Sequence, residues 1–311
     1  MSQRSKTPSN PASGVLLVDK PQGITSHDAV SRTRKAIGTR RVGHAGTLDP
    51  MATGLLVLGV NGATRLLTWV VGLDKEYTAT IRLGAGTNTD DAEGELGPRS
   101  DTAGVTDGAV AAGVAALTGA ILQRPSSVSA IKVDGRRAYT LVREGEEVVL
   151  AERPVTISEF EVVETRRVST GSTNERLDLD VRVVCSSGTY IRALARDLGD
   201  GLGVGGHLTA LRRTRIGPFG VEGASGLDPD DLPHLADRML RPADAATRLF
   251  ERVDLSADDA VDLGHGKRIA LPETGTGTLA AVDPAGRLVG LVQNVGGRAH
   301  VLVNFPKEAG S

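Results

Sequence analysis

A single carboxylate, Asp49, stands in a glycine- and threonine-rich loop over residues 43–54, directly before the apolar run 55–60. Glycines allow positive φ and let a ligand approach the backbone closely. Pro50 keeps Asp49 out of the α region and stiffens the turn. The loop thus presents one acid at a fixed place, which suits a covalent nucleophile or a group that stabilises a cation. The alternative is a tight turn whose aspartate caps a backbone amide.

Four other motifs accompany this loop. They are VDKPQGITS at residues 18–26, KEY at 75–77, CSSGTYIRAL at 185–194 and LTALRR at 208–213. Together with the Asp49 loop, and in this order, they resemble the motifs of bacterial tRNA pseudouridine-55 synthases, the TruB family. The resemblance covers residues 14 to about 220. One departure is Val128, which stands where many members of the family carry an aromatic residue.

The resemblance implies an isomerase that converts uridine 55 in the T loop of tRNA to pseudouridine. The N1–C1′ bond of the nucleotide breaks, the base turns, and a C5–C1′ bond forms. This reaction involves no redox change and no phosphate transfer, so we expect neither a cofactor nor a metal. The family match makes Asp49 the nucleophile, and attack at C1′ or at C6 of the base are both open.

The resemblance also implies roles for five further residues. Arg192 is the cation beside the nucleophile, because a guanidinium can grip a carboxylate with two hydrogen bonds and keep it ionised. Tyr77 offers a ring on which uracil can stack, and Leu211 forms a wall of the pocket. His44 occupies the space left by the flipped nucleotides, since a base inside a folded loop must be extruded before it can react. Lys20, with the proline that follows it, supports the Asp49 loop.

The expected partner is the T arm of tRNA, bound by a cytoplasmic monomer without a guide RNA and without a membrane. Two alternatives are a non-catalytic tRNA-binding or tRNA-folding module, and the guide-RNA-dependent relatives of archaea and eukaryotes. The segment 125–150 resembles the family's mobile RNA-binding insertion, and it favours the stand-alone type.

The charge of the chain is uneven. The net charge is −2 and the pI is near 6.3, so the bulk composition does not indicate a nucleic-acid partner. Basic residues nevertheless gather near the candidate site, and we expect some of them to contact phosphates while others hold the fold. They are Arg32, Arg34, Arg40, Arg41, Arg212, Arg213 and Arg215.

Other classes of site are not supported by the sequence. Cys185 is the only cysteine and ends an alternating strand pattern, which favours a packed thiol and excludes a disulfide framework. The six histidines lack metal-ligand spacing. The glycine pattern at 201–206 lies between a helix and a strand, the reverse of a dinucleotide fingerprint, and predicts a turn. No apolar run reaches the roughly 20 residues that a membrane span needs.

The elements that must position these residues follow from periodicity and turn signals. Ser26 is expected to cap a helix that buries Ala29, Val30, Thr33 and Ile37 and ends at Gly38. A short helix is expected over 63–70, a loop over 84–105, a helix over 107–117 closed by Gly119, and a helix over 190–198. A hairpin is expected around Asp134-Gly135. Strands are expected at 15–18, 55–60, 77–83, 155–167, 177–185 and 207–216.

These elements predict an α+β protein with a mixed, largely antiparallel sheet and flanking helices, for which the resemblance implies the pseudouridine synthase fold. We expect residues 1–13 to be a disordered tail and residues 14–245 to form the catalytic domain. Prolines near residues 228–248 mark a boundary. Short strands at 278–282, 288–293 and 299–305 predict a small β-rich, PUA-like domain over residues 249–308.

Overall fold

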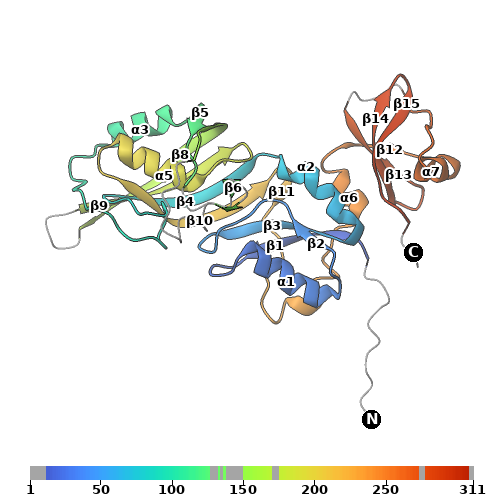
Figure 1. The fold of residues 1–311 in the computed structure, drawn as a ribbon, viewed down its shortest axis with the longest axis horizontal. Helices are drawn as coiled ribbons and strands as arrows, with labels where there is room; N and C mark the ends of the chain where they lie inside the picture. The colour runs from blue at the N-terminus through green and yellow to red at the C-terminus, as the bar shows by residue number, and fades with distance from the viewer. Residues whose placement is uncertain are drawn as a thin grey trace, which may run out of the picture. The chain divides into compact units, whose positions relative to one another are not determined.

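A computed structural model describes residues 12–126, 132–133, 136–137, 150–169, 175–272 and 277–307. Within these residues the chain forms two compact units (Figure 1). Unit 1 comprises the described residues of Met1–Pro50, Gly54–Val71 and Ile216–Ser311, and unit 2 comprises those of Met51–Thr53 and Gly72–Arg215. Residues 1–11 of the expected tail (1–13) and most of the expected insertion at 125–150 lie outside the described residues.

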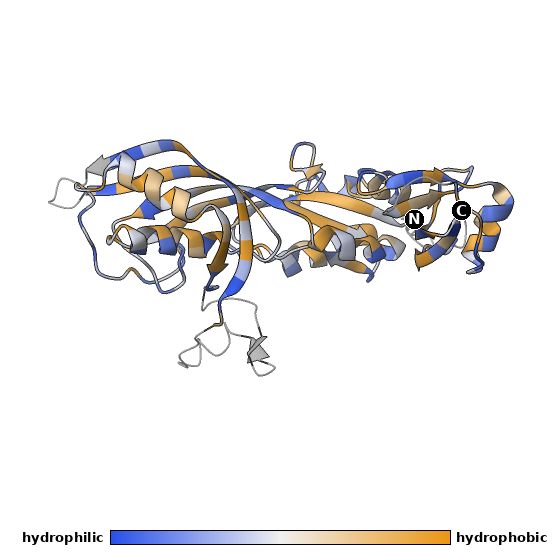
Figure 2. Cartoon of the chain, turned by 90° about the horizontal axis from the view of Figure 1, so that it is seen from above, coloured by the Kyte–Doolittle hydropathy of each residue, from blue (hydrophilic) through white to orange (hydrophobic). Residues whose placement is uncertain are grey.

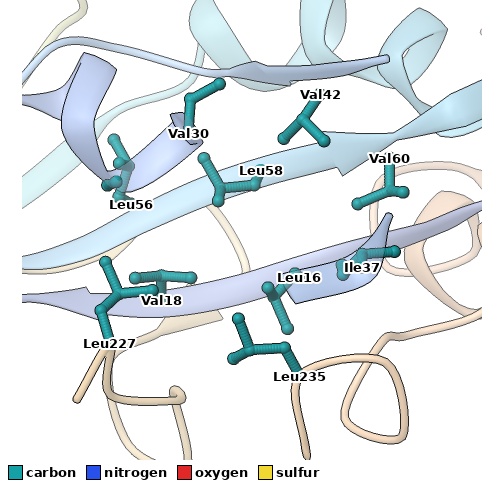
Figure 3. Close-up of a cluster of buried hydrophobic side chains, with 11 residues drawn as sticks. Leu16, Val18, Val30, Ile37, Val42, Leu56, Leu58, Val60, Leu227 and Leu235 are labelled. Atoms are coloured by element: carbon teal, nitrogen blue, oxygen red, sulfur yellow. The ribbon is translucent and has the colours of Figure 1, made fainter. Parts of the chain in front are cut away.

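The N-terminal part of unit 1 is an antiparallel ladder with one helix against it. Strand β1 (Gly14–Lys20) pairs with β3 (Thr53–Val60), and β3 also pairs with β2 (Val42–His44). Helix α1 (Ser26–Ile37) buries the residues expected from its periodicity and ends at Gly38, whose φ of +77° only glycine adopts readily. Its apolar face packs on β1 and β3 around Leu16, Leu56 and Leu58 (Figure 3).

The start of α1 differs from the expectation. Thr25 is the N-cap, and its hydroxyl accepts from the backbone N–H of Asp28 at 3.0 Å, while the carboxylate of Asp28 accepts from the backbone N–H of Thr25 at 2.9 Å. This reciprocal pair is a capping box. Ser26 is the first residue of the helix, and its hydroxyl is used elsewhere, as described below.

The rest of unit 1 contains short helices and a second sheet. After β3 come the 3₁₀ helix η1 (Asn61–Leu66) and α2 (Leu67–Val71). Then follow β11 (Phe219–Gly220), η2 (Leu232–His234), α6 (Pro242–Ala246) and α7 (Ala257–Gly264). The separate four-stranded sheet has the order β12 (Glu251–Asp254), β13 (Thr278–Val282), β14 (Leu288–Val295) and β15 (Arg298–Asn304), with its own apolar core. This sheet confirms the expected small C-terminal β-rich domain.

In its described residues, unit 2 is a twisted sheet covered by two helices. Its strands lie in the order β10 (Gly206–Ile216), β4 (Lys75–Leu83), β9 (Glu175–Cys185), β8 (Arg153–Ser169) and β5 (Gly119–Gln123). Helices α3 (Asp107–Ala116) and α5 (Ile191–Gly201) lie side by side on it (Figure 1), with α3 against β8 and α5 against β4. Figure 2 shows hydrophobic and hydrophilic residues alternating along the long strands, as expected for a sheet with one buried face.

Three local expectations can be compared with unit 2. Strands β6 (Lys132–Val133) and β7 (Arg136–Arg137) pair in the register of a hairpin with a two-residue turn, as expected, although the turn residues themselves lie outside the described residues. Gly119 does not close α3: it begins β5, with a φ of +94°. The glycine pattern at 201–206 does link α5 to β10, with Gly203 and Gly205 at positive φ.

Candidate active site

The Asp49 loop connects β2 to β3 and belongs mostly to unit 1. Ala45 donates its backbone N–H to the Val57 carbonyl at 2.9 Å, and Gly46 takes a φ of +92°. Leu48 and Met51 are buried, whereas Asp49 between them is half-buried. The loop is therefore fixed by apolar side chains on both sides of a partly accessible carboxylate.

The residues on each side of Asp49 are held by the first motif. The Ser26 hydroxyl accepts from the backbone N–H of Leu48 at 2.8 Å and donates to the carbonyl of Leu48 at 3.1 Å. On the other side, the Pro50 carbonyl accepts from the backbone N–H of Gly23 at 2.8 Å. The backbone is thus pinned immediately before and after Asp49, which limits the positions that its carboxylate can adopt.

Lys20 is a third residue of the first motif that makes a hydrogen bond to the Asp49 loop. Its side chain is 0% exposed, and its Nζ donates to the carbonyls of Ile24 at 2.8 Å, Pro21 at 3.0 Å and Pro50 at 3.5 Å. Burying a charge is costly unless its hydrogen bonds are made, so these carbonyls stabilise the ammonium where it lies. The contact with Pro50 is the kind expected of a residue that supports the Asp49 loop.

His44 ends β2, opposite Leu58 of β3, and is half-buried. The pairing of β2 with β3 thus sets the position of the histidine, five residues before Asp49. The role of His44 in occupying the space of a flipped base stays a prediction.

Tyr77, Leu211 and Arg192 lie in unit 2. Tyr77 is on β4 opposite Val183 of β9, Leu211 is on β10, and both are buried. Arg192 is in the first turn of α5 and is only 4% exposed, so it is not an ordinary surface arginine of a helix. The pairing of Arg192 with Asp49 stays a prediction.

Arg192 is held by the segment after β4, which was expected only as a loop over residues 84–105. Its Nη1 donates to the Thr89 carbonyl at 2.8 Å and to the Ser126 hydroxyl at 3.4 Å, and lies 3.3 Å from Oδ2 of Asp91. Asp91 is itself 3% exposed, and its Oδ1 accepts from the Thr89 hydroxyl at 2.6 Å and the Glu93 backbone N–H at 3.0 Å. The guanidinium is therefore paired and oriented by residues 89–91 and Ser126.

Asp91 was not among the site residues expected from the sequence, although the sequence contained a signal for it. Asp90 and Asp91 are adjacent acids in a loop whose other residues are mostly small. Two adjacent carboxylates repel each other, which destabilises the fold unless cations lie close to them. Asp90 sits at a φ of +62°, and burial raises the pKa of its carboxyl, although Arg196 Nη1 lies 3.1 Å from its Oδ2. Each acid thus meets a different arginine of α5.

The start of α5 is held by Gln123, the last residue of β5. Gln123 Oε1 accepts from the backbone N–H of Tyr190 at 2.8 Å, and its Nε2 donates to the Tyr190 carbonyl at 3.1 Å. Tyr190 is the N-cap of α5 and provides no side-chain cap of its own. The amide of Gln123 therefore positions the helix turn that carries Arg192.

Several of the arginines expected to contact phosphates have protein partners. Arg34 Nη2 donates to the Val42 carbonyl at 2.9 Å, and Arg215 Nη2 pairs with Asp74 at 2.9 Å. Arg213 is 1% exposed, which makes it one of the arginines that hold the fold. Residues on a strand alternate between faces, and Arg213 lies on the inner one.

Three remaining features bear on other classes of function. Cys185 is 1% exposed and burial raises the pKa of its thiol to about 11, which confirms a packed thiol. Within the described ranges, three or more His, Cys, Asp or Glu side chains do not gather into a metal-binding group. In the same part of the chain, every helix is too short or too polar to cross a membrane.

Family comparisons cover most of the chain. Residues 34–191 match the TruB family pseudouridylate synthase N-terminal domain, residues 192–248 match the tRNA pseudouridylate synthase B C-terminal domain, and residues 250–306 match the tRNA pseudouridine synthase II C-terminal domain. A protein of Leifsonia xyli subsp. xyli named tRNA pseudouridine synthase B is 56% identical over 305 residues, covering 95% of this chain and 97% of its own. One of the same name from an Arthrobacter species is 55% identical, covering 94% and 96%.

Solved structures are similar at the level of the fold. A chain in a structure of an H/ACA RNP bound to a substrate RNA containing 2′-deoxyuridine has a TM-score of 0.69 at 24% identity, covering 94% of this chain and 85% of that one. A chain in a crystal structure of a Cbf5-Nop10-Gar1 complex has a TM-score of 0.66 at 25% identity, covering 95% and 87%. These likenesses support the α+β fold expected from the sequence.

Proposed function

Because this chain belongs to the TruB family of pseudouridylate synthases, we propose that it is a tRNA pseudouridine synthase that isomerises uridine 55 in the T loop. The observation that carries the proposal is the Asp49 loop, whose backbone is pinned on both sides of one partly accessible carboxylate. The relatives named tRNA pseudouridine synthase B, similar over nearly their whole length, support tRNA as the substrate.

In the proposed reaction Asp49 attacks the target nucleotide or stabilises the cation formed from it, and the glycosidic bond is exchanged from N1 to C5. The support is the hydrogen-bonded backbone on both sides of Asp49, since catalysis needs a reacting group held within a small range of positions. Tyr77 provides the stacking face and Leu211 the apolar wall. Arg192 provides the positive charge, already oriented by Asp91, Thr89 and Ser126.

The proposed enzyme acts as a cytoplasmic monomer without a guide RNA, a metal or a cofactor. The match of 52–56% identity with proteins named tRNA pseudouridine synthase B supports this over the guide-dependent type, since the likeness to the H/ACA chains is one of fold. A non-catalytic tRNA-binding module is disfavoured by the combination of Asp49, Tyr77 and Arg192, although binding and catalysis can coexist.

Tritium release tests the proposal. The pure protein is mixed with a bare tRNA transcript that carries tritium at C5 of its uridines, and formation of the C5–C1′ bond releases one tritium per turnover. We expect one equivalent per tRNA, and none from a matched transcript that has cytidine at position 55. Release that persists with the cytidine transcript would contradict the position, and no release from either transcript would contradict stand-alone catalysis.

A further inference from the structure

Two arginines of α5 face two adjacent acids of the loop after β4. Arg192 pairs with Asp91, as described above, and Nη1 of Arg196 lies 3.1 Å from Oδ2 of Asp90. Residues four apart on a helix lie on the same face, one turn from each other. The second pair therefore holds the loop against α5 at the residue directly before Asp91.

Arg196 also binds the segment that follows β5. Its Nη2 donates to the carbonyl of Arg124 at 2.7 Å. Two residues later, the hydroxyl of Ser126 accepts from Arg192 Nη1 at 3.4 Å and donates to the Thr89 carbonyl at 3.2 Å. Arg196 thus contacts both of the segments from which the described partners of Arg192 come, within one or two residues of those partners.

The backbone of Asp90 is in a conformation that needs support. Its φ of +62° lies in the left-handed region, which is unfavourable for residues other than glycine, although Asp and Asn tolerate it best. The Asp90 carbonyl accepts from the backbone N–H of Leu208 at 3.0 Å, and its carboxylate faces Arg196. Such conformations persist only where their surroundings fix them. The pair with Arg196 therefore stabilises a loop shape that residues 89–91 would not adopt by themselves.

The same pair is a poor candidate for a purely stabilising contact. Burial raises the pKa of the Asp90 carboxyl, although Arg196 and the Ser126 hydroxyl act in the opposite direction. Taking two charges out of water offsets much of their attraction, so a buried ion pair adds little to stability compared with apolar residues of the same volume. Orientation of a neighbouring group explains better why charges are placed here.

We propose that Arg196 and Asp90 are positioning residues for Arg192. They do not contact the substrate, and they hold residues 89–91 and Ser126 where these orient the Arg192 guanidinium. This inference rests on the proposed function, because it takes Arg192 as the positive charge used in the reaction.

A double-mutant cycle between positions 196 and 192 tests the proposal. Single-turnover tritium release and tRNA affinity are measured for wild type, Arg196→Gln, Arg192→Lys and the combined variant. Arg82→Gln is the matched control, because Arg82 forms a similar pair with Asp178 in the same unit. The side chains of that pair are 30% and 8% exposed, against 24% and 11% for Arg196 and Asp90.

We expect Arg196→Gln to lower the single-turnover rate about tenfold and to change tRNA affinity less than about twofold, because a displaced charge affects the chemical step. In the Arg192→Lys background, the same substitution should change the rate less than about twofold, since residues that act through one another are not additive. Arg82→Gln should leave the rate unchanged. An equal fall in both backgrounds, no fall with Arg196→Gln, or the same fall with Arg82→Gln would overturn the inference.

Asp90→Gly guards against a general loss of structure. Glycine adopts a φ of +62° readily, so this substitution removes the contact with Arg196 and at the same time relieves the backbone. We expect the rate to fall as in Arg196→Gln, and the two substitutions together to lower it no further. A rate equal to that of wild type would contradict a positioning role for Asp90.

A second readout is independent of turnover. The guanidinium N–H signals of Arg192 are observed by NMR in protein labelled at arginine, and they are assigned by their absence in Arg192→Lys. We expect their protons to exchange with water faster in Arg196→Gln than in wild type, because loosened groups open more often. In Arg82→Gln they should exchange as in wild type.

The two readouts separate the positioning inference from the proposed reaction. If wild type released no tritium but the Arg192 signals changed in Arg196→Gln, the reaction would fail and the positioning of Arg192 would stand. If wild type released tritium and the Arg192 signals were the same in Arg196→Gln, the positioning inference alone would fail, whether or not the rate fell.

Discussion

Arg192 Nη1 lies 3.3 Å from Oδ2 of Asp91, and both side chains are almost completely buried. Removing one member of a buried pair leaves an uncompensated charge, which typically costs 3–5 kcal/mol. The arginine is therefore positioned by the fold of unit 2 before any substrate binds. Its orientation is set by Asp91 together with the Thr89 carbonyl and the Ser126 hydroxyl.

Arg192→Lys tests this positioning. Lysine keeps the charge but loses the planar set of donors that meets several acceptors at once. We expect the single-turnover rate to fall at least tenfold, about 1.4 kcal/mol of barrier, with a modest change in tRNA affinity. Rapid-mixing kinetics with excess enzyme measure both quantities, and an unchanged rate would show that Arg192 is only structural.

Asp49→Asn tests the proposed nucleophile. Asparagine keeps the shape of the side chain and removes its charge, and the contacts that pin the loop go to the backbone of Leu48 and Pro50 and are not altered. We expect tritium release to disappear while tRNA affinity stays near that of wild type. Residual turnover within tenfold of wild type would contradict the assignment.

Ser26→Ala tests whether pinning of the Asp49 loop matters for the rate. The substitution removes the hydroxyl that contacts both the N–H and the carbonyl of Leu48, and buried polar groups left unpaired cost ~1–3 kcal/mol each. We expect lower stability and a lower kcat. Ser31→Ala is the matched control, because among the described residues the Ser31 hydroxyl contacts only the His27 carbonyl, on an exposed face of α1. Equal kcat values for the two variants would contradict a positioning role.

Lys75 predicts a pH dependence of stability. Burial and the neighbouring Arg213 lower the pKa of Lys75 from 10.5 to about 8. Between these two values the unfolded chain binds more protons than the folded one, so stability rises with pH across the window from about 8 to 10.5. Over this range, the free energy of unfolding of wild type should rise by on the order of 3 kcal/mol relative to that of Lys75→Met.

Urea unfolding at pH 7.5 and pH 10.5 measures this gain. Lys35→Met, at an exposed lysine of α1, controls for the general effect of removing one lysine. The prediction would be contradicted if the free energy of unfolding of wild type, relative to that of Lys75→Met, stayed constant or fell as the pH rises.

Local signals in the sequence determined most of the elements. The apolar period of α1, the glycine at its end and the alternation of β8 and β9 are properties of short segments, and the structure follows them. The Asp49 loop could be recognised in the same way, because its glycines and proline act on the backbone of their own neighbours. The order of the motifs was enough to identify the family.

Only the tertiary structure decided which of these residues meet. Thr25 caps α1 because the hydroxyl of Ser26 is directed to Leu48, a residue beyond the helix and β2. Asp91 meets Arg192 because the loop after β4 folds onto the start of α5, and no periodicity links positions so far apart. Arg213 is buried while Arg212 is half-buried, since the face of a strand depends on its register in the sheet. Local propensity acts over a few residues, whereas pairing across the chain depends on the packing of complete elements.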